Sequence, residues 1–307
     1  MKVRYTEKQP RVHCTRAKVV SSRDLPDGFA RMKLIIPAIA RQAKPGQFVS
    51  VLCPTDDRRV RMFNTAEDWA AVYRRKPARA PGSPPLLRRP ISIHQVGKNG
   101  TLELLFKVIG RGTKLLSCLK SRDHVDVLGP MGNGFDLSGR YDTAIIVAGG
   151  AGIAPMPYLA KTLHKMKKKV VIIAGTKDVF PIDMSLFSSF GAELLLSKET
   201  RHRGYHHGLC TELLEQYLDK CGRRTCHSVQ AFSCGPKAMQ HAVAKICSKN
   251  SVPLQVSLEQ RMGCAMGACM ACVQKVLNKQ GYSDAHNVRV CTEGPVFDGE
   301  KVVWNEK

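Results

Sequence analysis

Short apolar segments separated by glycine and proline turns run through residues 11–130. The segments are rich in β-branched side chains, which favour strands over helices. They lie at 12–20, 29–36, 47–52, 90–95 and 101–108. This pattern predicts a small antiparallel β-barrel.

The pattern changes after residue 130, where continuous apolar runs alternate with helix-like stretches. Such runs are typical of strands that are buried on both faces, and their alternation with helices predicts a parallel α/β sheet. The apolar runs are 144–148, 170–174, 192–196 and 229–234, and the helical stretches are 156–168, 211–217 and 237–249.

At about 100–150 residues per domain, a chain of 307 residues predicts two or three domains. The fold class that we expect is therefore multi-domain α+β. We place the barrel at 1–138, the α/β domain at 139–250 and a small glycine- and cysteine-rich domain at 251–307. The stretch 54–88 is crowded with arginines and contains PARAPGSPP, so we expect an insertion there, with a short helix near 66–74.

The charge of the chain is strongly asymmetric. Lys and Arg number 48 against 25 Asp and Glu, which gives a net charge of +23. The last 57 residues hold six basic and six acidic side chains, so the whole excess lies in residues 1–250. This excess suggests an anionic ligand or partner. The basic stretch 58–79 has few aromatic residues, which weakens the case for nucleic acid.

The twelve cysteines could form disulfides in a secreted protein or remain reduced thiols inside the cell. The start of the chain, MKVRYTEKQPRVHCTR, lacks the apolar core of a signal peptide, so reduced thiols in the cytoplasm are expected rather than a disulfide framework. Residues 143–160 carry no charge but contain three glycines and two prolines. We therefore expect no membrane span.

The most informative cysteines follow the spacing C-x4-C-x2-C, with a fourth after eighteen further residues: Cys264, Cys269, Cys272 and Cys291. This is the plant-type spacing for a [2Fe–2S] cluster. The small residues 265–268 would let backbone N–H groups turn toward the sulfurs. A structural zinc site with four cysteine ligands is the alternative, but zinc favours paired C-x2-C motifs and only one pair has that spacing.

Two glycine turns follow predicted strands and precede predicted helices, which is an arrangement suited to a pyrophosphate at a helix N-terminus. Each turn alone is also consistent with an ordinary tight turn. If both strands belong to one parallel sheet, the two turns would lie at the carboxyl ends of its strands and line the same crevice. Their candidate residues are Gly149, Gly150, Gly152 and Pro155 in the first turn and Cys234, Gly235 and Pro236 in the second.

Two further segments of the barrel offer phosphate ligands. In RRPIS (88–92), Arg89 and Ser92 could grip a phosphate, and in GRGT (110–113) a glycine turn opens a short helix. RRPIS alone is more typical of a solvated strand end than of a ligand site. Together with a redox cluster and a nucleotide-type sheet, the two segments favour a flavin site.

These motifs give the chain a resemblance to a known family. It resembles the electron-transfer subunits of the NAD-linked, two-subunit dihydroorotate dehydrogenase, within the ferredoxin–NADP⁺ reductase superfamily. The likeness runs from about residue 12 to 303. It rests on KPGQF (44–48), RRPISI (88–93), GRGT (110–113), LGPMGNGF (128–135), GGAGIAP (149–155), SCGP (233–236), SLEQRMGCAMGACMACV (257–273) and CTEGPVF (291–297).

The resemblance assigns cofactors to residues. It implies a [2Fe–2S] cluster on the four spaced cysteines, NAD at the two glycine turns named above and FAD on the barrel. It implies no catalytic residue for dihydroorotate oxidation in this chain. The FAD residues that it implies are Arg89, Pro90, Ile91, Ser92, Leu105, Phe106, Lys107, Gly112 and Thr113.

The function that the resemblance implies is electron transfer in de novo pyrimidine (UMP) biosynthesis. A partner subunit with FMN would oxidise dihydroorotate, and electrons would pass through the cluster and FAD to NAD⁺. Two copies of each subunit would form a heterotetramer. The chain departs from the family at 54–88, because family members usually pass from the PGQF strand to RRPIS without such an insertion. A related ferredoxin:NADP⁺ oxidoreductase or sulfide dehydrogenase subunit is one alternative, and a nucleic-acid-binding iron–sulfur protein is another.

The choice between NAD and NADP rests on the residues after the strand predicted at 170–174. Asp178 could accept a hydrogen bond from a ribose hydroxyl and would repel a 2′-phosphate, whereas Lys177 could attract one. With the family resemblance, we expect NAD.

Overall fold

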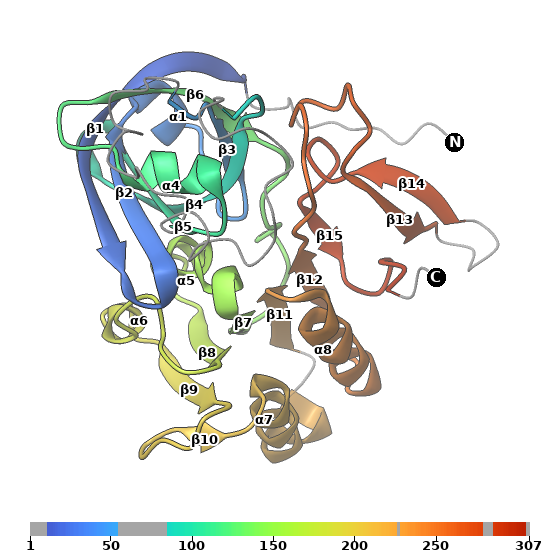
Figure 1. Cartoon of the computed structure of the whole chain (residues 1–307). Helices are drawn as coiled ribbons and strands as arrows, with labels where there is room; N and C mark the ends of the chain where they lie inside the picture. The colour runs from blue at the N-terminus through green and yellow to red at the C-terminus, as the bar shows by residue number, and fades with distance from the viewer. Residues whose placement is uncertain (1–10, 55–84, 226–227, 279–284, 305–307) are drawn as a thin grey trace.

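The computed structural model describes residues 11–54, 85–225, 228–278 and 285–304. A β-barrel, a mixed sheet flanked by helices and a C-terminal arm lie side by side (Figure 1). The basic stretch 54–88, with the helix expected near 66–74, lies almost wholly outside the described residues. Within the described part of the chain, no helix is long and apolar enough to cross a membrane.

The barrel is closed by six strands in the order β1-β2-β5-β4-β3-β6, and every neighbouring pair is antiparallel. Five of these strands coincide with the predicted segments, and β6 is the one that the prediction missed. Short helices η1 (Pro26–Gly28), α1 (Pro37–Ala40), η2 (Lys98–Gly100) and α4 (Arg111–Ser117) connect them. The strands are β1 (His13–Leu25), β2 (Phe29–Ile35), β3 (Phe48–Val51), β4 (Arg89–Val96), β5 (Thr101–Lys107) and β6 (His124–Met131).

The second sheet has seven strands in the order β10-β9-β8-β7-β11-β12-β15. All neighbouring pairs are parallel except β12 with β15. This agrees with the predicted parallel α/β sheet. The strands are β7 (Thr143–Gly149), β8 (Lys169–Thr176), β9 (Glu193–Lys198), β10 (His206–His207), β11 (Val229–Cys234), β12 (Leu254–Ser257) and β15 (Val296–Asp298).

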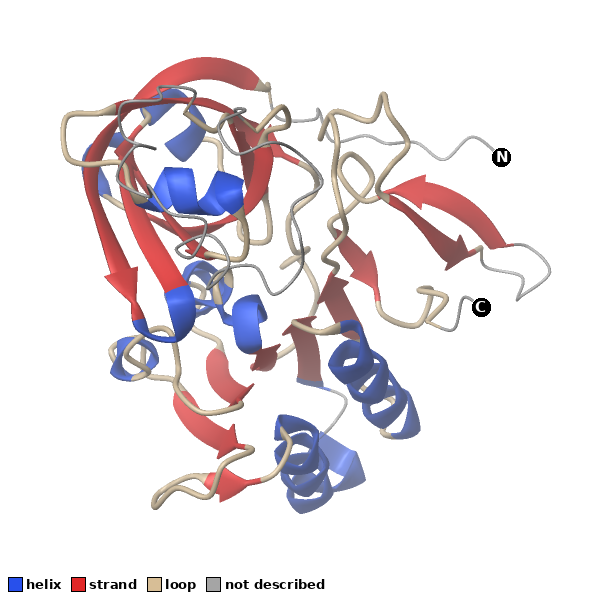
Figure 2. Ribbon diagram, in the orientation of Figure 1, coloured by secondary structure: helices blue, strands red, loops and turns tan. Residues whose placement is uncertain are grey.

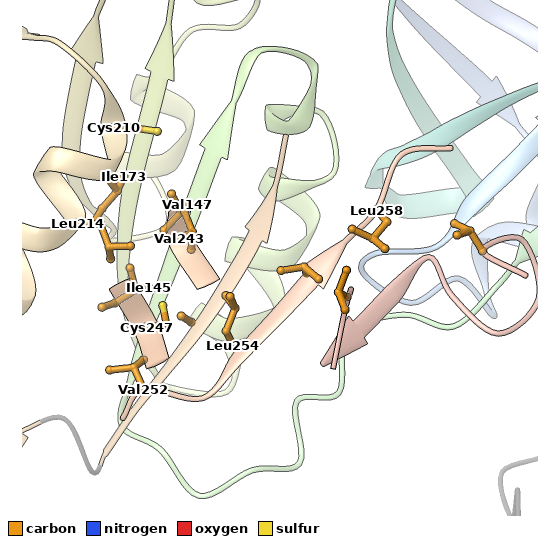
Figure 3. Packing of buried hydrophobic residues seen from close by; sticks show 14 of the residues in the cluster. Ile145, Val147, Ile173, Cys210, Leu214, Val243, Cys247, Val252, Leu254 and Leu258 are labelled. Atoms are coloured by element: carbon orange, nitrogen blue, oxygen red, sulfur yellow. The ribbon is translucent and has the colours of Figure 1, made fainter. Parts of the chain in front are cut away.

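Helices cover both faces of this sheet (Figure 2). Helices α7 (Cys210–Thr225) and α8 (Lys237–Lys249) pack on one face, where Leu214 and Val243 meet Ile145 and Val147 (Figure 3). The opposite face is covered by η3 (Gly150–Ile153), α5 (Met156–Lys165) and α6 (Ser185–Ser188). Burying each such aliphatic side chain contributes about 1.5–3 kcal/mol, which explains why β7 and β8 read as continuous apolar runs.

The C-terminal arm is joined to the sheet by its own strands. Strands β12 and β15 come from residues after 250 and extend the sheet beyond β11. Between them the chain forms a loop and the two-stranded sheet of β13 (Val273–Leu277) and β14 (Ala285–Arg289). The cysteine-rich segment is therefore held close to the ends of β11 and β12.

Candidate functional site

The structure brings the four spaced cysteines together as two pairs. The backbone amide of Cys264 donates to Cys269 Sγ at 3.4 Å, and that of Cys291 donates to Cys272 Sγ at 3.4 Å. A [2Fe–2S] cluster takes two protein ligands on each iron, so two pairs of thiols suit it. Among the described residues, no group of three or more Cys, His, Asp or Glu side chains is placed to hold a metal ion.

Backbone N–H groups point at the sulfurs, as the small residues of the loop predicted. The amides of Met266 and Cys269 each donate to Cys264 Sγ at 3.4 Å. The amide of Cys291 donates to Cys272 Sγ at 3.4 Å. Burial raises the pKa of Cys264, but these N–H groups lower it by more, so that it falls to about 7. Such donors stabilise the thiolate form that a metal cluster requires.

The loop reaches this geometry through left-handed backbone conformations. Ala265, Gly267 and Met270 have φ values of 60°, 85° and 55°. The side chain of Thr292, which follows the last cysteine, presses against the loop: a methyl group on Gly267 would lie 3.0 Å from Thr292 Cγ2. The hydroxyl of Thr292 is buried and finds no hydrogen-bond partner within the described part of the chain. A buried hydroxyl normally has a partner, and the acceptor-rich sulfur atoms of a cluster would supply one.

The barrel faces this loop across a cavity of about 310 Å³. Asn133, just after β6, donates from its side-chain amide to the Glu293 carbonyl at 3.0 Å and from its backbone to the Gly294 carbonyl at 2.6 Å. The motifs LGPMGNGF and CTEGPVF are therefore in direct contact. The cavity is lined by Val12, Leu128, Pro130, Met131, Gly132, Asn133, Met266, Cys291 and Thr292.

The candidate flavin residues Arg89 and Gly112 meet at the start of α4. A methyl group on Gly112 would lie 2.6 Å from Arg89 Nε, so only glycine lets the guanidinium lie against the turn. Thr113 Oγ1 closes the turn by donating to the Gly110 carbonyl at 2.9 Å. The neighbouring Arg88 turns away and pairs with Asp126 on β6. RRPIS and GRGT, separate in sequence, thus form one basic, glycine-lined corner.

The other candidate flavin residues occupy β4 and β5. Ile91 is buried in the barrel core, and Ser92 lies opposite Phe48 of β3. Leu105 packs outside the barrel core, whereas Phe106 points into it. Lys107 Nζ lies 2.9 Å from an Asp27 carboxylate oxygen. Pro90 pairs in register with Ser50.

The two glycine turns also meet. Ala148 of β7 and Cys234 of β11 are paired in register, so both strands end at the same edge. A methyl group on Gly152 would lie 2.1 Å from the Cys234 carbonyl oxygen, and one on Gly235 would lie 3.0 Å from the Gly149 carbonyl oxygen. Gly150 has φ of 52°. This close packing requires glycines and leaves one continuous backbone rim.

Helices begin directly after both turns, as predicted. Pro155 is the N-cap of α5, and Pro236 is the N-cap of α8. Burial raises the pKa of the Cys234 thiol, which keeps it protonated. Gln240 of α8 donates to the Gly235 carbonyl at 2.8 Å and to the Ser257 carbonyl at 3.0 Å. The second turn is thereby tied to the end of β12, from which the cysteine loop departs.

Comparisons with known proteins agree with this geometry. A family model for the iron–sulfur cluster binding domain of dihydroorotate dehydrogenase B matches residues 259–303. The dihydroorotate dehydrogenase B (NAD(+)) electron transfer subunit of Desulforamulus reducens is 36% identical over 276 residues, which are 89% of this chain and 92% of the relative. The chain belongs to this family. The family resemblance read from the motifs is confirmed.

Other relatives and solved structures are consistent with that assignment. The corresponding subunit of Enterococcus faecalis is 32% identical over 291 residues, covering 93% of this chain and 96% of the relative. The structure of an NADH-dependent reduced ferredoxin-NADP oxidoreductase superposes with a TM-score of 0.69 at 23% identity, over 94% of this chain and 90% of that one. A ferredoxin reductase of carbazole 1,9a-dioxygenase superposes with a TM-score of 0.58 at 18% identity. The match covers 80% of this chain and 69% of that one. These structural likenesses show the fold, in agreement with the predicted multi-domain α+β class.

Several residues that join the parts of the site make contacts that the sequence does not reveal. Asn133, Gln240 and His94 make long-range contacts through single side chains. Asn133 lies inside the landmark LGPMGNGF, which flagged the segment without revealing its partner. Gln240 and His94 lie in an amphipathic helix and a strand, where nothing distinguishes them from ordinary polar positions.

Proposed function

We propose that this chain is the electron-transfer subunit of an NAD-dependent dihydroorotate dehydrogenase and serves de novo pyrimidine biosynthesis. The observation that carries the proposal is the pairing of the four cysteines, within the segment that the family model matches, beside a barrel and a nucleotide-type sheet. One chain thus offers sites for a one-electron carrier, a flavin and a dinucleotide. We further propose the domain limits 1–138, 139–250 and 251–307, with β12 and β15 completing the central sheet.

We assign Cys264, Cys269, Cys272 and Cys291 to the cluster. The backbone donors around Cys264 and Cys272 would stabilise its negative charge. The flavin, when bound, exchanges electron pairs with nicotinamide and single electrons with an iron–sulfur centre. The residues of this chain bind and orient these groups, and no described residue is needed as a base for dihydroorotate.

We assign FAD to the corner formed by Arg89, Gly112 and Thr113 together with strand residues 90–92 and 105–107. The Arg89 guanidinium would form a charge-assisted bond with a phosphate, and the turn before α4 would accept the diphosphate backbone. Phe106 points into the barrel, so it would contribute through its backbone.

We assign NAD to the rim formed by the turns at 149–155 and 233–236. Glycines there leave room for a pyrophosphate to approach the backbone, and the helix starts present a positive dipole end. Asp178, which follows β8, accepts a hydrogen bond from Thr200 Oγ1 at 3.3 Å and is held where it could receive a ribose hydroxyl.

We propose that the partner is a catalytic subunit containing FMN, in an assembly of two copies of each chain, in the cytoplasm. Met266 and Met270, on the cysteine loop, are 58% and 52% exposed. They lie in the electrically neutral last 57 residues, although the chain carries +23 overall. An apolar, neutral surface beside the cluster suits stable docking. A reducing compartment suits the many free thiols.

The test is a cofactor and activity analysis of the purified full chain. We expect two irons, two acid-labile sulfides and one non-covalent FAD per chain, together with NADH-dependent reduction of an artificial dye. Stoichiometric zinc without sulfide, or a protein that binds no flavin, would contradict the proposal.

A further inference from the structure

His94 is a fully buried histidine at the junction between the barrel and the nucleotide sheet. It is 0% exposed and lies on β4, two residues after Ser92. Side chains alternate along a strand, and Ile91 and Ile93 point into the barrel core. The register of β4 against β5 shifts between Ile93 and Gln95, so His94 lies at this irregularity. Its ring meets the Ala154 carbonyl, at the junction where helix α5 packs against β4.

The ring makes one hydrogen bond to the glycine-rich turn. Its Nδ1 lies 2.6 Å from the carbonyl oxygen of Ala154, within GGAGIAP. A carbonyl oxygen only accepts, so Nδ1 must carry the proton. The other nitrogen, Nε2, is buried with no partner in the described part of the chain. The carbonyl partner therefore fixes a proton on Nδ1.

A second hydrogen bond joins the barrel and helix α5, and here the helix supplies the donor. Tyr158, one turn further along α5, donates from its hydroxyl to the Ala43 carbonyl at 2.6 Å. The start of α5 is thus held to the barrel at two points, once by a barrel side chain and once by its own.

We propose that His94 is a positioning residue that sets the separation between the flavin-binding strand and the NAD-binding turn. Strand β4 begins with Arg89 and passes through Ser92, and the turn ends at Ala154 and Pro155. The bond from His94 to Ala154 is a direct side-chain link between these two segments. Electron-pair exchange between two bound groups depends steeply on their separation, so a link at this point governs the rate. The inference rests on the proposed function, which assigns flavin and NAD to the two segments.

The test compares two substitutions in the full chain with its cofactors. In His94→Asn the short amide keeps a donor near the place of Nδ1, whereas His94→Leu fills the space without a donor. His124→Leu, at an exposed position on β6, is the matched control. We measure flavin reduction by NADH in anaerobic stopped flow, with and without deuterium at the transferred position, and the ¹⁵N NMR signals of the His94 ring.

For His94→Leu we expect flavin reduction to slow by about tenfold or more, with a larger deuterium isotope effect and unchanged flavin and cluster absorbance. His94→Asn should keep most of the rate, and His124→Leu all of it. In the unsubstituted protein the NMR signals should show the proton on Nδ1.

Three results would overturn the inference. They are an unchanged rate in His94→Leu with its cofactors retained, an equal loss in His94→Asn and His94→Leu, or a proton on Nε2. The NMR result decides even if His94→Leu does not fold. A protein that showed the Nδ1 proton but no flavin reduction by NADH would refute the proposed function and with it the positioning role.

Discussion

At the residue scale, two adjacent arginines with different partners give a sharp test of the flavin site. Arg89 lies against Gly112, whereas Arg88 pairs with Asp126. Arg89→Ala removes a charge-assisted bond to phosphate that is worth about 1.5–3 kcal/mol, so FAD affinity should fall roughly ten- to a hundredfold. Fluorescence titration of the flavin-free protein measures it.

Arg88→Ala is the control, because it removes an arginine of the same motif that does not reach the turn. It should leave FAD affinity close to that of the unsubstituted protein. FAD bound with full affinity by Arg89→Ala would remove Arg89 from the site.

The proposed cluster ligands give a second test at this scale. Cys269→Ser should abolish the cluster absorbance and the labile sulfide while FAD stays bound, because the cysteine loop and the Arg89 corner are built from different elements. Cys14→Ser replaces another exposed cysteine, outside the spaced set, and should keep the cluster. A cluster that survives Cys269→Ser would show that Cys269 is not a ligand.

His94 also predicts a dependence of stability on pH. Burial lowers its pKa below the ordinary value of 6.5, and the charge of Arg31 lowers it further, against raising effects of the Ala154 bond and Glu103. Below about pH 6.5 the His94 side chain binds a proton in the unfolded chain but stays neutral in the folded chain. The contribution of neutral His94 to the free energy of unfolding is therefore fully present above pH 6.5. It is lost progressively as the pH falls below that value.

Denaturant unfolding at pH 8 and pH 5 measures this effect. Asparagine does not titrate, so His94→Asn should lose less stability on acidification than the unsubstituted protein does. Equal losses in the two proteins would show that His94 does not contribute.

At the element scale, the contact between the two glycine turns predicts the effect of a single methyl group. Gly152→Ala would place a carbon 2.1 Å from the Cys234 carbonyl, so β7 and β11 could keep their turns together only by shifting backbone. NADH affinity should fall while flavin and cluster contents stay constant. Gly139→Ala, at an exposed glycine outside both turns, should bind NADH normally. Isothermal titration with NADH compares the two variants. Equal NADH affinities would show that Gly152 does not belong to the site.

Much of the element pattern could be predicted from local sequence. Helix α8 and strand β11 lie where the periodicity placed them, because their apolar positions fall on a regular face or run. Strands β12 and β15 were missed because they have only four and three residues, whereas β6 was missed although it has eight. The four cysteines were recognisable from spacing alone. The contacts of His94, Asn133 and Gln240 depend on tertiary packing, which leaves no local pattern.

At the scale of the whole molecule, the cysteine arm is held between the two larger parts. Strands β12 and β15 join it to the central sheet, and Asn133 joins it to the barrel (Figure 1). On its loop, Met266 and Met270 are 58% and 52% exposed, and Met266 also lines the cavity of about 310 Å³. This arrangement leaves part of the cysteine loop accessible to a second protein, while the segment after Cys291 contacts the barrel through Asn133.

The most direct test of the account is an assay of the purified chain with dihydroorotate and NAD⁺, before and after the FMN-containing catalytic subunit is added. The chain alone should reduce a dye with NADH but form no orotate, because we find no second flavin site or substrate base in the described residues. Adding the catalytic subunit should restore orotate formation coupled to NADH. Robust orotate formation by the chain alone would contradict the assignment as an electron-transfer subunit.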